Sequence, residues 1–73
     1  MSRCSYIGER LRGTGIVAVR HFVAEGSACR WAAREQRAYP QDTVRVVRGN
    51  GWPVCWRDVV DRERNPGRYL FVA

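Results

Sequence analysis

Apolar and polar positions in the first third of the chain follow the period of β-strands. A mixed segment over 4–11 leads into the turn signal RGTG at 12–15, and a β-branched and aromatic run, IVAVRHFVA, occupies 16–24. Such residues pack well on a pleated sheet, and a short glycine-containing loop between two strand segments is typical of an antiparallel hairpin. We therefore expect a hairpin whose second strand, 16–24, is central in the sheet.

The hydrophobic period then changes to that of a helix. Ser27 is a suitable N-cap, the residues after it are mostly good helix formers, and Pro40 ends the pattern. This pattern predicts a helix over 27–38. The stripe expected to face the sheet combines one aromatic with small residues: Ala28, Trp31 and Ala32.

Three further strands are predicted after the helix. TVRVVR at 43–48 and WPVCWRDV at 52–59 flank the hairpin signal GNG, and RYLFV at 68–72 follows a polar stretch. The resulting order, β-β-α-β-β-β, predicts an α+β fold: an antiparallel sheet of four to five strands with one helix on one face. The chain of 73 residues is expected to form a single domain over 1–73.

Two tryptophans are expected in the core. On a strand over 52–59, Trp52 and Trp56 share one side, and tryptophan is highly buried on average. If one of them is exposed instead, it becomes a candidate interface anchor. His21, inside a β-branched segment, is expected to be packed and hydrogen-bonded rather than catalytic.

The cysteine pattern indicates neither disulfides nor a metal site. Cys4, Cys29 and Cys55 are scattered, without any C-x-x-C pair. Together with His21 they could supply four zinc ligands, but structural zinc sites take their ligands in close pairs, so we expect buried, reduced thiols and no metal. The first residues, MSRCSYIGER, lack the apolar run of a secretory signal, which favours the cytoplasm.

Charge narrows the class of partner. Thirteen basic residues, all arginine, face seven acidic ones, which gives a net charge of +6. Because guanidinium is planar and suits bidentate contacts with carboxylate or phosphate, an acidic protein surface or a nucleic acid is the natural partner. A basic surface without any partner is the alternative.

A ridge on the predicted helix is the leading binding site. Arg30, Arg34 and Arg37 recur at i, i+4 and i+7, over about 10 Å of helix. Like charges at this spacing are mildly destabilising, which favours a binding role over a merely solvated face. Arg45 and Arg20 on the predicted strands are lesser candidates. The main competitor for the binding role is the N-terminal segment with Arg3, Arg10 and Arg12.

No motif for catalysis is present. The sequence has no glycine-rich phosphate loop, no paired carboxylates on one element and no histidine beside a plausible nucleophile. We therefore expect a binding protein that is not an enzyme and needs no cofactor.

The helix segment resembles a family of very small bacteriophage proteins. ACRWAAREQ at 28–36 is similar to their AKRxASxxQ helix, and further similarities lie at Tyr6–Ile7, Asp42–Val44 and the Asn50–Gly51 turn. The family includes type I anti-CRISPR proteins. In size and arginine content the chain also resembles the RNA-polymerase-binding transcription inhibitors of lytic Xanthomonas phages. Both groups act in host takeover.

This resemblance implies a phage protein in the cytoplasm of a bacterial host. The leading hypothesis is a monomer that binds the β′ subunit of host RNA polymerase and inhibits transcription initiation, with antitermination as a further activity. An anti-CRISPR protein that binds a crRNA-guided surveillance complex is the first alternative. A small basic nucleic-acid-binding module is the second.

Overall fold

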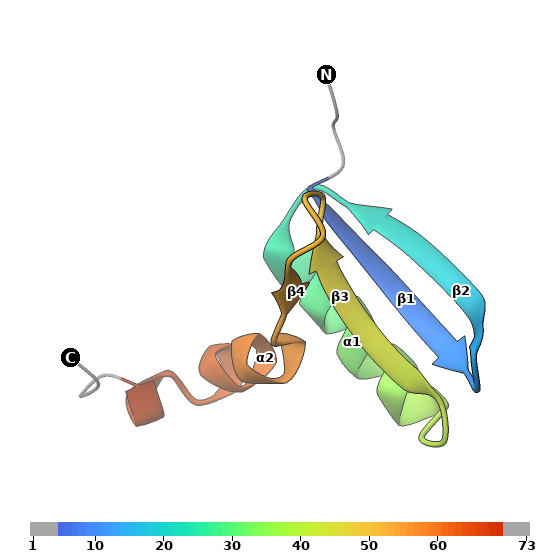
Figure 1. Ribbon diagram of the computed structural model, residues 1–73. Coiled ribbons are helices and arrows are strands. Elements are labelled where there is room, and N and C mark those ends of the chain that lie inside the picture. Colours follow the sequence, from blue (N-terminus) through green and yellow to red (C-terminus); the bar gives the residue numbers. More distant parts are fainter. Residues whose placement is uncertain (1–4, 70–73) are drawn as a thin grey trace.

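The computed structural model describes residues 5–69, which form a four-stranded antiparallel sheet, two α-helices and one 3-10 turn. The elements follow in this order: β1 Tyr6–Arg12, β2 Gly15–Phe22, α1 Glu25–Ala38, β3 Thr43–Arg48, β4 Pro53–Val54, α2 Trp56–Arg64 and η1 Pro66–Tyr69. Helix α1 covers one face of the sheet, and α2 lies beside β4 at one side of the molecule (Figure 1). The α+β class is confirmed, but the prediction of a single helix is wrong within the described residues.

The strand order in the sheet is β2-β1-β3-β4, so β1 is central and β2 lies at an edge. The prediction that 16–24 forms a central strand is therefore wrong. Its β-branched composition indicates a strand but not its position in the sheet. Position is decided by pairing, and β1 pairs antiparallel with both β2 and β3.

The predicted hairpin turns are present. Gly13 between β1 and β2 has φ 64°, and Gly51 between β3 and β4 has φ 91°. Positive φ is a left-handed conformation that only glycine adopts without strain. Both turns therefore depend on these glycines.

Helix α1 packs its small residues and one tryptophan onto the sheet, as predicted. Ala28, Trp31 and Ala32 are buried. The helix begins at Glu25, two residues before the predicted start, and Ala24 occupies the N-cap without a side-chain hydrogen bond. Ser27 is therefore not the cap, and Glu25 in the first turn interacts favourably with the helix dipole instead.

Helix α1 lies close to the sheet at Gly8 in β1. A Cβ placed on Gly8 would lie 2.5 Å from Cε3 and Cζ3 of Trp31. The Trp31 ring also packs against Phe22 of β2, with ring centroids 5.9 Å apart. The indole ring thus occupies the space that the missing side chain leaves.

The predicted strand over 52–59 is instead a two-residue strand followed by helix α2. β4 pairs with β3 only through Pro53 and Val54. Because Trp56 lies on a helix, it turns into the core, where it is 7% exposed and its Nε1 donates to the Val44 carbonyl at 3.0 Å. Trp52 is 67% exposed, so the expectation that both tryptophans are buried is wrong for Trp52.

The last predicted strand also differs from the structure. Residues 66–69 form the 3-10 turn η1, and residues 70–72 of the predicted strand lie outside the described part of the chain. Across the described residues, no helix combines the length and the apolar character that a membrane span needs.

The cysteines differ in their surroundings. Cys29 in α1 is buried and free, as expected, and burial raises the pKa of its thiol to about 11. Cys55, which precedes α2, is free but exposed, so the expectation of a buried thiol is wrong there. Cys4 lies outside the described residues. Between residues 5 and 69, no three His, Cys, Asp or Glu side chains group as they would around a metal ion.

Candidate arginine-rich binding site

Two adjoining hollows lie between α1 and α2, and together they form what we call the arginine groove. The larger has a volume of about 430 Å³ and the smaller about 140 Å³. Helix α1 contributes Gln36 and four residues that lie on one face: Arg30, Ala33, Arg34 and Arg37. Helix α2 contributes Trp56 and four residues at the same spacing: Arg57, Val60, Asp61 and Arg64. Each wall is thus one face of a helix, at i, i+3, i+4 and i+7.

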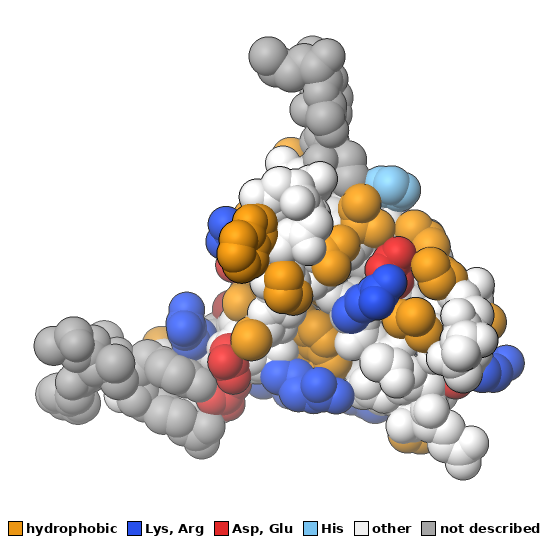
Figure 2. Space-filling view, in the orientation of Figure 1, with side chains coloured by type: hydrophobic (Ala, Val, Ile, Leu, Met, Phe, Trp, Pro, Cys, Tyr) orange, Lys and Arg blue, Asp and Glu red, His pale blue; other side chains and the backbone are white. Residues whose placement is uncertain are grey.

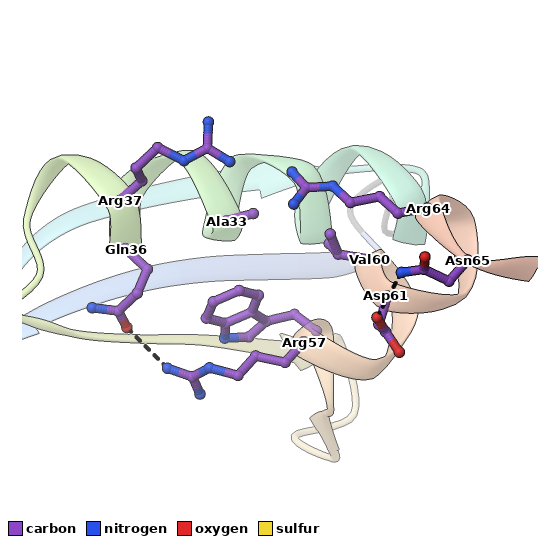
Figure 3. A pocket seen from close by; sticks show the side chains of 9 residues that line it. Ala33, Gln36, Arg37, Arg57, Val60, Asp61, Arg64 and Asn65 are labelled. Carbon is purple, nitrogen blue, oxygen red and sulfur yellow. Dashed lines mark hydrogen bonds between the residues drawn. The ribbon is translucent and has the colours of Figure 1, made fainter. Parts of the chain in front are cut away.

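The floor of the groove is apolar, and it is also the place where the two helices pack. Val60 and Trp56 of α2 are buried in the core cluster, and Ala33 of α1 packs against it. Figure 3 shows Ala33 and Val60 between the arginines of the rim. The apolar packing that fixes α2 against α1 therefore also sets the spacing of the charged rim.

One end of the groove is held by hydrogen bonds. Arg57 lies over the Trp56 ring at 4.5 Å, and its Nη2 donates to Oε1 of Gln36 at 3.3 Å, the dashed line in Figure 3. Gln36 Nε2 in turn donates to the backbone carbonyl of Asp42 at 2.8 Å. These contacts orient Arg57 and tie α2 to the end of α1.

Two carboxylates belong to the groove region and compensate part of its charge. Glu63 accepts from Nη1 of Arg30 at 3.3 Å, with both side chains about half exposed. Asp61 lines the groove and accepts from Nδ2 of Asn65 at 3.0 Å. The groove is therefore lined by five arginines and one acidic residue, Asp61, and Glu63 pairs with one of these arginines.

Three of the rim arginines have no ion pair or hydrogen bond within residues 5–69: Arg34, Arg37 and Arg64. Figure 3 shows Arg37 and Arg64 reaching toward each other from opposite helices. Guanidinium groups that face each other without a counter-charge repel, and they attract anions to the space between them. The groove can therefore bind a carboxylate- or phosphate-bearing group.

The structure brings together the predicted ridge but changes its composition. Arg30, Arg34 and Arg37 lie on α1, as expected. Arg30 is already paired with Glu63, whereas Arg57 and Arg64, which the sequence interpretation did not single out, join the site from α2. The helical spacing of Arg57, Val60, Asp61 and Arg64 was the signal that could have identified them.

Arg10 and Arg12 lie in a separate cluster around Asp42. Arg10 is buried, donates to Asp42 Oδ2 at 2.5 Å and to Glu35 Oε1 at 3.1 Å, and lies over the Tyr39 ring at 3.6 Å. Arg12 donates twice to Asp42, each time at 3.1 Å. The burial of Arg10 contradicts the expectation that it is available to a partner. Arg12 keeps an exposed side chain, but its charge is used by Asp42.

The hydrogen bond from Arg12 is the largest cause that lowers the pKa of Asp42 below 3.8, and the bond from Arg10 adds to it against the effect of burial. The cluster joins the end of β1 to α1 and to the turn before β3. Its arginines therefore hold the fold together.

The remaining candidates lie away from the groove. Arg45 is exposed opposite the buried Val44 and Val46, as predicted, and its Nε donates to Glu9 at 2.5 Å. Arg20 is exposed on β2, near the Phe22 ring. His21 on β2 is exposed rather than packed, and Arg3 lies outside the described residues.

Comparison with known proteins gives no match: no family model, no curated protein and no solved structure is similar to this chain.

Proposed function

We propose that this chain is a non-catalytic binding protein that docks by its arginine groove on an acidic surface of a large bacterial nucleic-acid machine. The observation that carries the proposal is the convergence of Arg34, Arg37 and Arg64, which form no ion pair within residues 5–69. Holding like charges together is unfavourable in the free protein. A partner that supplies carboxylates relieves this repulsion on binding.

The lining of the groove favours a protein partner over a nucleic-acid backbone. Its floor of Ala33 and Val60 offers apolar contacts to the side chains of a protein partner. Arginine is enriched at the centres of protein interfaces, where its planar group makes paired hydrogen bonds and stacks on aromatic rings. Arg57 already stacks in this way on Trp56.

Host RNA polymerase is the machine that the family resemblance points to. In this proposal the chain is a phage protein that binds the β′ subunit in the bacterial cytoplasm and inhibits promoter-dependent initiation, with antitermination as a further activity. The groove supplies the attachment, and the inhibition follows from the presence of the bound domain on the enzyme.

The test is a binding and transcription assay with purified polymerase. Arg37→Glu and Arg64→Glu are compared with Arg20→Glu, which makes the same charge change on β2, outside the groove. We expect the wild type and Arg20→Glu to bind and inhibit, and each groove variant to lose affinity at least about tenfold, since opposite-charge contacts become repulsive. Equal losses in all three variants would show that only the net charge matters.

Failure to bind polymerase would overturn this choice of partner. A surveillance complex retained by the wild type and Arg20→Glu, but not by the groove variants, would support the groove as an anti-CRISPR surface. If the chain binds duplex DNA with an affinity that falls steeply as salt is raised, the groove binds nucleic-acid phosphates and the proposal of a protein partner is wrong.

A further inference from the structure

One face of the sheet is not covered by any described helix. Helix α1 packs on the face that carries Gly8, Val44 and Val46, and the opposite face is open (Figure 1). Alternate residues of each strand point to this open face. Three rows of the strand register cross it: His21–Ile7–Val47–Pro53, Val19–Glu9–Arg45 and Ile16–Leu11–Thr43.

The open face is apolar where a solvated sheet would carry polar residues. In an antiparallel sheet with one face in solvent, the residues that point to that face are normally polar. Here six of its ten positions are apolar: Ile7, Leu11, Ile16, Val19, Val47 and Pro53. Ile16 and Val19 are each 49% exposed, and Figure 2 shows apolar side chains spread across this side of the molecule.

The charges on the open face cancel each other. Arg45 and Glu9 are register partners in its middle row, and Arg45 Nε donates to Glu9 Oε1. Figure 2 shows one basic and one acidic side chain side by side among apolar ones on this face. The face is therefore electrically neutral in a chain whose net charge is +6.

In place of the monomer expected from the sequence, we propose that this open face is a homodimer interface on which a second copy of the chain stacks, sheet against sheet. A two-fold axis brings a surface against itself, so the surface must be self-complementary. An apolar face with one adjacent pair of opposite charges meets this condition, because Arg45 of one copy comes to lie beside Glu9 of the other. Between copies with a net charge of +6 each, a neutral surface is also where repulsion is weakest.

The size of the face agrees with a weak, reversible dimer. Three strands of six to eight residues and the short β4 cover a flat area of roughly 350 Å² at the usual strand spacing and rise. Two such faces together lie near or below the total of about 1,000 Å² that a specific interface normally buries. We therefore expect association in the micromolar range or weaker.

The dimer would present two arginine grooves. No residue of the open face lines the groove, so the inference does not rest on the proposed function. If both hold, two linked grooves bind a partner with two acidic sites more tightly than one groove does.

A charge-exchange experiment tests the inference. Sedimentation velocity across the micromolar to submillimolar range should show a concentration-dependent dimer for the wild type. Glu9→Arg alone and Arg45→Glu alone should each be monomeric, because each places like charges together at the centre of the stack. An equimolar mixture of the two variants should dimerise again, since one copy then carries two basic groups where the other carries two acidic ones.

Several results would overturn the inference. These are a wild type that is monomeric throughout, single variants that dimerise like the wild type, or a mixture that stays monomeric. If two copies instead paired through the edge strand β2, the single variants would still dimerise like the wild type, because Glu9 and Arg45 lie on inner strands.

A second pair of variants covers the case in which a charge variant fails to fold. Val19→Lys places its ammonium across from Glu9 within the same copy, so the fold of each copy should be preserved. The charge lies in the proposed interface, so the apolar contact between the two copies should be lost. Gln41→Lys adds the same charge at an exposed position after α1. Only Val19→Lys should abolish the dimer, and equal behaviour of the two variants would contradict the proposal.

Discussion

Replacing Gly8 by alanine tests the central packing contact of the fold. The new methyl group would lie 2.5 Å from two ring carbons of Trp31, whereas carbon atoms in contact are normally about 3.5–4.0 Å apart. The buried ring or the strand must therefore move by about 1 Å. Gly8 does not have positive φ, so the backbone itself accepts alanine and the effect is purely steric.

The expected magnitude follows from two opposing contributions. Overpacking a core costs about 1–3 kcal/mol, while replacing glycine inside a strand gains about 0.5–1 kcal/mol because the unfolded chain is restricted. The net result is a loss of about 1–2 kcal/mol in the free energy of unfolding. In a domain of this size that lowers Tm by roughly 5–15 °C, measured by thermal denaturation followed by far-UV circular dichroism.

Gly15→Ala is the matched control. At Gly15 the nearest atom to an added methyl group is the Arg12 carbonyl oxygen at 3.8 Å, an ordinary contact, so this variant should be neutral or slightly stabilised. Trp31→Phe removes the ring atoms that obstruct Gly8, and in that background the Gly8→Ala loss should shrink or change sign. If Gly8→Ala is as stable as Gly15→Ala in the native chain, the Gly8–Trp31 packing described above is incorrect.

Two further predictions concern titratable groups. Because hydrogen bonds from Arg12 lower the pKa of Asp42, its ionised form stabilises the fold above pH 3.8, and this stabilisation is lost as the pH falls through the folded-state pKa. Asp42→Asn should therefore reduce the dependence of the free energy of unfolding on pH at acidic pH. If that dependence is the same in the variant and the wild type, the role assigned to Asp42 is wrong. Burial raises the pKa of the Cys29 thiol to about 11. Iodoacetamide at pH 8 should therefore alkylate the exposed Cys55 and not Cys29 until the protein unfolds, which peptide mapping measures. Equal labelling of both cysteines in the folded protein would show that Cys29 is not buried.

Local patterns in the sequence predicted helix α1 well. Its inward stripe and its C-terminal end before Pro40 depend on neighbours three and four residues apart, which a single sequence displays. The N-terminal end differed by two residues because Glu25 offers a favourable charge in the first turn and no side-chain cap forms. The contact of Trp31 with Gly8 joins residues distant in sequence, and no local pattern displays it.

Helix α2 was missed because two periods overlap in one stretch. Trp52, Val54 and Trp56 alternate like a strand, whereas Trp56 and Val60 are four apart and lie on one side of a helix. The strand ends after Val54 because pairing with β3 ends there, and the helical pattern then prevails. As a result the α1 wall of the arginine groove was predicted, and the α2 wall was not.

The edge position of β2 could not be read from composition either. Its valines and isoleucine are the residues that a buried central strand would carry, and the sequence was interpreted in that way. Within residues 5–69, β2 is paired only with β1, and Ile16 and Val19 are about half exposed. The interpretation of β2 was therefore wrong at a strand whose apolar side chains no other described element covers.

The net charge of +6 did not by itself locate a binding surface, because ion pairs divide the arginines unequally. Glu9 pairs with Arg45, which leaves the open face without net charge, whereas Arg34, Arg37 and Arg64 in the groove form no ion pair within residues 5–69. The two surfaces therefore depend on different forces. Salt screens attraction to the groove, whereas a kosmotropic salt such as sulfate strengthens apolar burial at the open face, so adding this salt acts on the two proposed associations in opposite directions.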